Sequence, residues 1–246
     1  HDVGLAYPSA IGLWGGGDGY VVEHNEVHDT TYSAMICGGS DGRVESNLIY
    51  NAMTVLHDGA GIYSGGAKGL VMRGNFIRDI VDTGGYGASA YYLDEMCENC
   101  VVEGNLSLRV VRPSHNHWAG PNTVRGNVFV SDADMNVTFP RCKDYTFEQN
   151  VMWARGKITF RNAAAVTSMP GNVLFSGADE VVAVGLKDYA EGERVPLAPT
   201  GGTVLADPLL DAGDLERGVC RFAPDSPVHG LGLKTLDVSD AGPRPE

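Results

Sequence analysis

Two adjacent carboxylates, Asp94 and Glu95, end the apolar run "YYLDE". A pair of carboxyl groups can perform acid–base chemistry when one is held protonated and the other ionised. Acids at a strand end also commonly do no more than hydrate a turn. The aromatic run before these acids and the segment "HNHW" in the next repeat, which contains His115, His117 and Trp118, favour a functional role.

The elements that position these acids follow from an internal repeat. Short apolar runs flank one asparagine in each of seven segments, and the intervals between successive asparagines are 22, 28, 30, 22, 23 and 22 residues. The seven asparagines are Asn25, Asn47, Asn75, Asn105, Asn127, Asn150 and Asn172. A propeller blade needs about 40 residues, and helical repeats would show a 3.6-residue apolar period. The repeat therefore predicts a right-handed parallel β-helix of about seven to eight coils.

The asparagines are interpreted as structural. We expect each to adopt the left-handed backbone conformation at a bend and to hydrogen-bond its copies in the coils above and below. Coils carrying the site are predicted over residues 1–175, and the last coils with an irregular C-terminal cap over 176–246. The first coil has no comparable cap in the sequence. We expect a missing N-terminal segment or self-association to cover its edge.

Counting from each asparagine places the acids within the coils. Asp94 lies 11 residues before Asn105, which aligns it with Ser64 in the preceding coil and Asn116 in the following one. The same count aligns Glu95 with Gly65 and His117. Because neighbouring residues of a strand point to opposite faces, this position argues against a simple Asp94–Glu95 pair.

A second group of polar residues contains two His-Asp pairs, His28–Asp29 and His57–Asp58. Asp29 and His57 both lie 18 residues before their asparagines, so a contact between them is expected. The glycines of "DGAG" bring the backbone close to any ligand that lies across Asp58. No serine has the surroundings of a hydrolase nucleophile, so a Ser-His-Asp mechanism is not supported.

Aromatic residues recur near a column of paired glycines. Trp14, Tyr32, Tyr63, Tyr92 and Trp118 offer faces on which a sugar can stack, although packing in a corner or in the core is the commoner fate of such residues. The paired glycines are Gly15–Gly16, Gly38–Gly39 and Gly65–Gly66. Together these residues predict an open groove.

The overall composition limits the kinds of partner. Eighteen basic against 31 acidic residues give a formal charge of -13, which disfavours nucleic acid and anionic membranes. No apolar run has the length of a membrane span. Of five cysteines only Cys97 and Cys100 form a C-x-x-C pair, so buried thiols or a local disulfide are favoured over zinc. No metal or cofactor is predicted.

Several segments of the sequence resemble those of a known family. The segments "HDTTYSAMICGG", "HDGAGIYSGG", "YYLDE" and "HNHWAGPNTVRGNVFV" are similar to those of right-handed parallel β-helix glycoside hydrolases of the pectate-lyase-like superfamily, nearest to family 141, the α-L-fucosidase and xylanase group. The resemblance covers roughly residues 1–175. It implies secretion or a periplasmic location, a polysaccharide substrate, and catalytic carboxylates at Asp58 and Asp94.

Three functions remain open from the sequence. The first is hydrolysis of a glycosidic bond in a neutral or fucosylated polysaccharide by Asp58 and Asp94, with Glu95 as a supporting or alternative acid. Asp58 and Asp94 differ by six residues in their distance from the asparagines, about 20 Å along a straight strand, so a corner would have to bring them together. The second is a polysaccharide lyase with Arg109 or Arg112 as base. The third is a non-catalytic glycan-binding or structural β-helix fragment.

Overall fold

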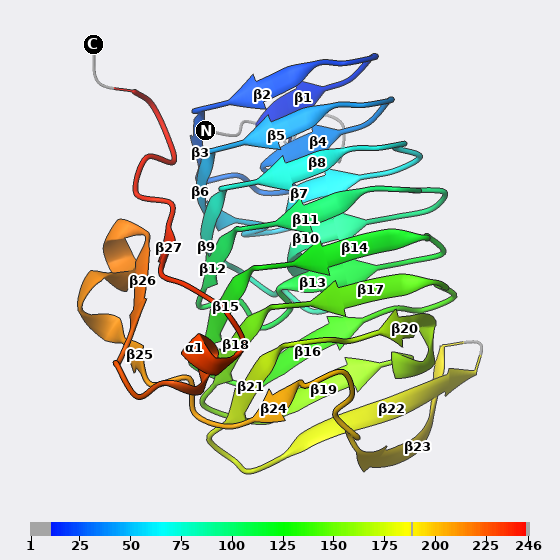
Figure 1. Ribbon diagram of the computed structural model, residues 1–246. Coiled ribbons are helices and arrows are strands. Elements are labelled where there is room, and N and C mark those ends of the chain that lie inside the picture. Colours follow the sequence, from blue (N-terminus) through cyan, green and yellow to red (C-terminus); the bar gives the residue numbers. More distant parts are fainter. Residues whose placement is uncertain (1–10, 188, 245–246) are drawn as a thin grey trace.

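The computed structural model describes residues 11–187 and 189–244, and these form an all-β structure with long parallel sheets (Figure 1). This arrangement is consistent with a β-helix or solenoid. The first ten residues of the predicted coil region 1–175 lie outside the described residues.

Three parallel sheets run along the stack. Sheet 1 consists of β1 (Leu13–Gly15), β4 (Met35–Cys37), β7 (Gly59–Ser64), β10 (Ala88–Leu93), β13 (Ser114–Asn116), β16 (Met135–Thr138), β19 (Ile158–Arg161) and β22 (Val181–Lys187), with β23 (Ala190–Pro196) antiparallel to β22. Sheet 2 consists of β2 (Val21–Glu23), β5 (Arg43–Glu45), β8 (Val71–Arg73), β11 (Val101–Glu103), β14 (Asn122–Arg125), β17 (Tyr145–Glu148) and β20 (Val166–Ser168). Sheet 3 consists of β3 (Glu26–His28), β6 (Leu48–Ala52), β9 (Phe76–Ile80), β12 (Leu106–Leu108), β15 (Val128–Ser131), β18 (Val151–Ala154), β21 (Val173–Ser176) and β24 (Val204–Leu205).

The chain passes through sheets 1, 2 and 3 in turn, and we call each such passage a tier; β10, β11 and β12 form one. Each strand directs alternate side chains inward, where they stack on their counterparts in the next tier. In sheet 2, for example, Val44, Met72 and Val102 are paired in register and buried. Because no tier can bury its inner face alone, this shared core joins all of them.

The repeated asparagines form the predicted ladder. Each side-chain amide nitrogen donates to the Oδ1 atom of the next asparagine, as from Asn75 to Asn105 (3.1 Å) and from Asn105 to Asn127 (2.9 Å). The ladder ends where Asn172 donates to the Thr203 hydroxyl (3.0 Å). The six asparagines from Asn47 onwards are fully buried, and their stacked amides satisfy one another.

The prediction that each asparagine adopts the left-handed backbone conformation at the bend is wrong. The left-handed conformation belongs to the residue before the asparagine, not to the asparagine itself. These preceding residues are His24, Ser46, Gly74, Gly104, Gly126, Gln149 and Gly171. The preceding residue turns the chain from sheet 2 to sheet 3, and the asparagine can then point its amide inward.

The last part of the chain lies along the outside of sheet 3 (Figure 1). It contains β25 (Leu210–Asp211), β26 (Val219–Phe222) and β27 (Leu236–Asp237), the 3-10 helix η3 (Ala212–Arg217) and the helix α1 (Pro227–Gly230). Leu215, Cys220 and Val228 pack here with Leu106 and Val128 of sheet 3. The chain then returns to the first tiers, where the Gly242 amide donates to the Ser46 carbonyl (2.9 Å).

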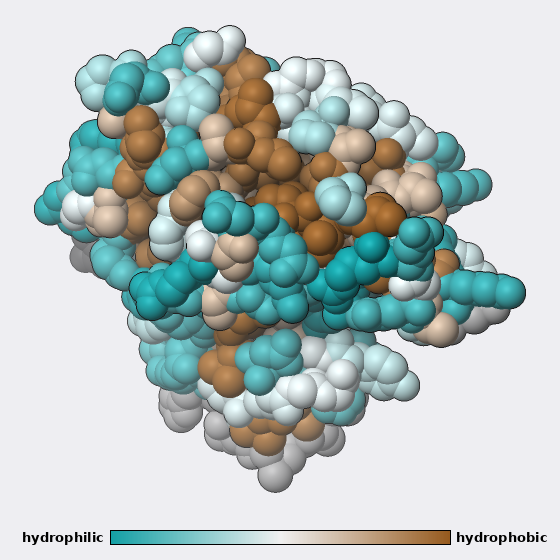
Figure 2. All heavy atoms as spheres, turned by 90° about the horizontal axis from the view of Figure 1, so that it is seen from below, coloured by the Kyte–Doolittle hydropathy of each residue, from teal (hydrophilic) through white to brown (hydrophobic). Residues whose placement is uncertain are grey.

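The opposite end of the stack carries a second 3-10 helix, η2 (Ala163–Ala165), and the β22–β23 hairpin. Viewed from below, apolar side chains form a band across this face between polar ones (Figure 2). Val195 of β23 and Leu205 of β24 are exposed apolar residues. No helix in the described ranges has the length and apolar character needed to cross a membrane.

All five cysteines are buried free thiols, so the buried-thiol prediction is confirmed and Cys97 and Cys100 form no disulfide. The Cys97 thiol donates to the Ser64 carbonyl (3.4 Å), and the Cys100 thiol donates to the Ala67 carbonyl (3.5 Å).

Candidate functional site

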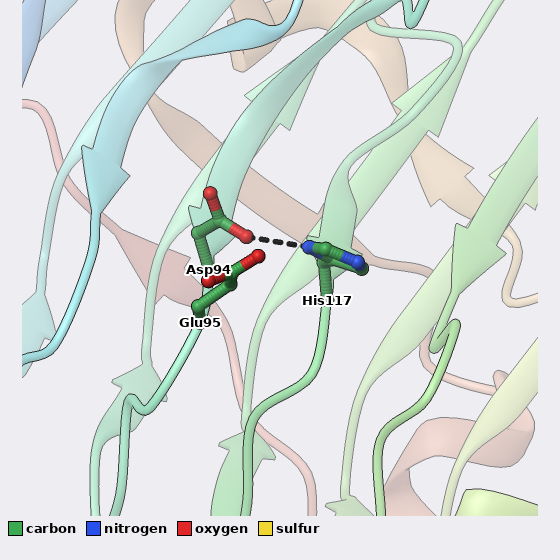
Figure 3. A group of neighbouring side chains, drawn as sticks. All are labelled: Asp94, Glu95 and His117. Atoms are coloured by element: carbon green, nitrogen blue, oxygen red, sulfur yellow. Dashed lines mark hydrogen bonds and ion pairs between the residues drawn. The ribbon is translucent and has the colours of Figure 1, made fainter.

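Asp94 lies one residue beyond the end of β10, at the edge of the outer face of sheet 1 (Figure 3). The register differs by one residue from the sequence prediction. Leu93 pairs with Ser64 and Asn116, which places Asp94 between Gly65 and His117. The count failed because Asp94 precedes its asparagine by 11 residues and His117 precedes its own by 10.

Two hydrogen-bond donors hold the Asp94 carboxylate. The Tyr63 hydroxyl donates to Oδ2 at 2.6 Å, and Nδ1 of His117 lies 2.7 Å from Oδ1. Both Asp94 and His117 are largely shielded, with side chains 17% and 16% exposed. The two contacts therefore fix the orientation of the Asp94 carboxylate.

Glu95 lies closer to Asp94 than strand geometry predicts. The two side chains do not point to opposite faces as predicted, because β10 ends at Leu93 and both acids lie in the segment that follows the strand. One carboxylate oxygen from each acid and a ring nitrogen of His117 lie within 4.8 Å of one another. Figure 3 shows both carboxylates directed toward the imidazole ring.

Tyr189 is a member of this site that the sequence did not predict. It lies beside β22 and β23, and its hydroxyl is 2.7 Å from Nε2 of His117. The guanidinium of Arg141 lies 4.7 Å from the centre of the Tyr189 ring and 5.5 Å from that of Trp118. The asparagine count ends at Asn172, before this antiparallel hairpin, so no signal in the repeat could have located Tyr189.

A row of aromatic rings lies beside Asp94 on sheet 1. The Tyr92 ring is 4.9 Å from Tyr63 and 4.3 Å from His115, centre to centre. Burial raises the pKa of both tyrosines, and the charge of Asp94 raises them further, so their hydroxyls stay protonated as donors. Burial, together with the charges of Arg112 and His117, holds the pKa of His115 well below its usual value. His115 Nδ1 is hydrogen-bonded to the Thr138 hydroxyl.

Asp58 approaches the same aromatic row from the other end of the strands. It precedes β7 with a left-handed backbone (φ 62°), a conformation that Asp tolerates better than most residues. The Tyr92 hydroxyl lies 3.5 Å from Asp58 Oδ1, at the limit of a hydrogen bond. The Tyr32 hydroxyl donates to the Asp58 carbonyl oxygen at 2.8 Å. Asp58 and Asp94 thus each contact one ring of the Tyr63–Tyr92 pair.

Arg112 lies close to Asp58 and Tyr92. Its guanidinium donates to the carbonyl oxygens of Tyr86 (2.7 Å) and Ala88 (3.3 Å). Burial lowers its pKa, although the nearby Asp82, Tyr92 and Asp58 oppose that shift.

A hollow of about 580 Å³ opens beside this row over the first tiers of sheet 1. Among the described residues its lining contains no charged side chain and consists of Ile11, Trp14, Gly15, Gly16, Gly17, Tyr32, Ile36, Cys37, Gly38, Gly39, Tyr63 and Gly65. Trp14 is 65% exposed there. All of the paired glycines predicted to border a groove except Gly66 line this hollow, and Tyr63 connects it to Asp94.

Three of the predicted residues have other surroundings. His28 and Asp29 lie at the end of β3 in sheet 3, where His28 hydrogen-bonds Asp29 (2.7 Å) and stacks on Tyr50 (4.7 Å). The expected contact between Asp29 and His57 is wrong: Asp29 contacts Asn51 of the next tier. His57 follows β6, which ends at Ala52, and lies in an inserted loop, so counting back from Asn75 did not align it with Asp29. His57 packs against Tyr86, and its Nδ1 atom is buried without a partner among the described residues.

Comparison with known proteins identifies no family for this chain. No protein-family model matches the chain, and no curated protein or solved structure matches it.

Proposed function

We propose that the three parallel sheets form a right-handed parallel β-helix of seven to eight coils with an irregular C-terminal cap, related to the pectate-lyase-like superfamily and nearest to glycoside hydrolase family 141. The ordered passage of the chain through sheets 1, 2 and 3 supports the coiled architecture. The asparagine ladder, which advances one rung per tier, supports it as well.

Within this fold, the protein is proposed to be a carbohydrate-active glycoside hydrolase that acts on a neutral or fucosylated polysaccharide outside the cell or in the periplasm. One observation carries the proposal: an oriented Asp94 carboxylate lies next to a hollow with aromatic and glycine walls. Sugars stack on aromatic faces, and a lining without charge suits a neutral ring.

The proposed mechanism uses two carboxyl groups. Asp94, which accepts hydrogen bonds from Tyr63 and His117, is the ionised nucleophile or base. Asp58, at the opposite end of the aromatic pair, donates the proton to the leaving oxygen. Carboxyl groups about 5 Å apart give retention of anomeric configuration, and groups about 6.5–9.5 Å apart give inversion. Glu95 supports Asp94 from its solvent side.

The proposal is tested by measuring reducing-sugar release from a panel of neutral, fucosylated and uronate-containing polysaccharides. Asp58→Asn and Asp94→Asn are each expected to lower the rate by at least about a hundredfold, and Glu95→Gln by less. Asp132→Asn, a change at an exposed acid of another tier, is the control. Normal hydrolysis by both Asp58→Asn and Asp94→Asn would contradict the mechanism.

The second candidate function is a polysaccharide lyase that uses Arg112 as its base. A lyase needs a base that can lose its proton, and burial lowers the pKa of Arg112 beside Tyr92. Arg109 is unsuitable because Asp79 and Glu216 both bind its guanidinium and raise its pKa. A product that absorbs in the ultraviolet and is lost in Arg112→Ala would favour the lyase. Glycan binding that survives replacement of both acids would favour a non-catalytic protein.

A further inference from the structure

Asp94, Glu95 and His117 bring two carboxylate oxygens and one imidazole nitrogen together from two neighbouring tiers (Figure 3). We propose that this group binds a divalent transition metal ion of the Zn²⁺ type. The proposal shares Asp94 with the proposed hydrolysis but does not depend on that reaction.

The spacing of the three atoms suits such an ion. They lie within 4.8 Å of one another, and ligand atoms around a tetrahedral Zn²⁺ are roughly 3.4 Å apart. Asp94 and His117 are anchored and largely shielded, whereas Glu95 is exposed. Asp94 Oδ1 and His117 Nδ1, now 2.7 Å apart, would separate by about 0.7 Å to admit the ion, and the exposed Glu95 side chain can rotate toward it.

Hydroxyl groups outside the trio hold two of the ligands in place. Tyr63 donates to Oδ2 of Asp94, so Oδ1 is the oxygen that would bind the ion, which would replace the hydrogen bond between Oδ1 and Nδ1 of His117. Tyr189 contacts Nε2 of His117. When Nδ1 binds a metal, Nε2 carries the ring proton, and a hydroxyl can accept it as readily as it donates. Such outer partners orient metal ligands and fix the histidine tautomer.

The charge around the trio also favours a cation. Within residues 11–187 and 189–244, neither Asp94 nor Glu95 forms an ion pair with lysine or arginine, whereas Glu98 nearby pairs with Lys68 (2.8 Å). Arg141 lies over the rings of Trp118 and Tyr189. A bound divalent ion would neutralise the two adjacent acids.

The ligand chemistry selects among divalent ions. Ca²⁺ takes six to eight oxygen ligands, but this trio supplies three ligands, one of them an imidazole nitrogen. Imidazole suits Zn²⁺, Ni²⁺ and Co²⁺. Three protein ligands leave a fourth position open. A metal bound to Asp94 would also withdraw that carboxylate from hydrolysis, so Zn²⁺ is expected to inhibit the proposed reaction.

The test is calorimetric titration of the tag-free, chelator-treated protein with ZnCl₂ in the absence of sugar. One ion per chain is expected, with affinity about tenfold or more weaker in His117→Ala and in Glu95→Gln. His28→Ala is the matched control, because His28 also hydrogen-bonds an adjacent aspartate at 2.7 Å but lies in sheet 3. Excess CaCl₂ is expected not to compete.

Co²⁺ absorption identifies the ligand atoms independently. Bound Co²⁺ is expected to show visible bands without the near-ultraviolet charge transfer that thiolates give, which excludes Cys97 and Cys100 as ligands. No binding by the wild type, unchanged binding by His117→Ala, or a thiolate band would overturn the proposal. Hydrolysis is assayed separately without metal, so loss of Zn²⁺ binding and absence of glycosidase activity are distinguishable failures.

Discussion

The hydroxyl of Tyr63 on β7 donates a 2.6 Å hydrogen bond to Asp94, which follows β10 in the next tier. Burial raises the pKa of Tyr63 and the hydrogen bond to Asp94 raises it further, so this donor remains protonated throughout the physiological range. The contact links the wall of the hollow to the carboxylate. Tyr63 therefore orients Asp94.

Replacing Tyr63 with Phe should lower the proposed polysaccharide hydrolysis by about tenfold to a hundredfold, because a hydrogen bond to a charged group contributes about 1.5–3 kcal/mol. The measurement is the initial rate at saturating substrate. Tyr50→Phe is a matched control, because Tyr50 also donates to a carboxylate, that of Glu26, at 2.8 Å. Equal activity of Tyr63→Phe and Tyr50→Phe would refute this role for Tyr63.

Filling the hollow at Gly65 should weaken substrate binding in proportion to side-chain size. A Cβ at this position meets no atom nearer than the Tyr63 hydroxyl oxygen at 3.7 Å, so alanine fits at ordinary contact distance. Gly65→Ala should change KM little, whereas Gly65→Leu should raise KM about tenfold or more. Circular dichroism checks that both variants fold. A Leu variant with the wild-type KM would show that sugar does not occupy the hollow.

Glu103 on sheet 2 should make stability depend on pH. Burial alone would raise its pKa, but hydrogen bonds from Arg125 (2.7 Å) and Arg73 (2.6 Å) outweigh this effect and lower the pKa below 4.5. A lowered folded-state pKa contributes stability at pH values above the unfolded-state value, and this is lost as the pH falls through the folded-state pKa.

The wild type should therefore exceed Glu103→Gln in free energy of unfolding by roughly 1 kcal/mol near pH 7 and by less near pH 3. Urea denaturation at the two pH values measures the difference. Glu148 on the neighbouring strand β17 forms no ion pair with an arginine of the described residues, so Glu148→Gln serves as the control. A pH-independent difference for Glu103→Gln would count against the ion-pair explanation.

Local repetition explains what could be predicted from the sequence. The asparagine rungs were predictable because Asn105 and Asn127 occupy the same place in consecutive repeats, and a single hydrogen-bond pattern satisfies both. Asp94 could be selected because it ends an apolar strand beside a histidine-rich repeat. Its exact neighbours could not be predicted, because one extra residue lies between Asp94 and Asn105. The asparagine count therefore aligned Asp94 with Ser64, whereas in the structure it lies beside Gly65.

Other features depend on contacts between segments that share no pattern. Tyr189 reaches His117 from an antiparallel hairpin that follows the last rung. Thr203 completes the ladder with a hydroxyl where a further asparagine would be expected. Strand β10 ends at Leu93, so the alternation of side chains between the two faces of a strand does not extend to Asp94 and Glu95. The Glu95 carboxylate can therefore lie beside that of Asp94. Each of these is set by tertiary structure.

Removing one rung of the ladder should destabilise the protein strongly. Asn105 donates to Asn127 Oδ1 (2.9 Å) and the Met72 carbonyl (3.0 Å), and its Oδ1 accepts two hydrogen bonds from Asn75. Asn105→Ala leaves several of these buried groups without partners, each at about 1–3 kcal/mol. A loss of at least about 3 kcal/mol in the free energy of unfolding is expected from urea denaturation.

The loss in free energy of unfolding should depend on where the asparagine lies in the ladder. Asn25 is only partly buried and donates to Asn47 (3.0 Å) at the end of the ladder, where water can replace it, so Asn25→Ala should cost about 1 kcal/mol. This variant also keeps the test informative if Asn105→Ala does not fold. Asn136→Ala, at a partly exposed strand position outside the ladder, should be nearly neutral. Similar losses for Asn25→Ala, Asn105→Ala and Asn136→Ala would show that the stacked amides do not stabilise the fold.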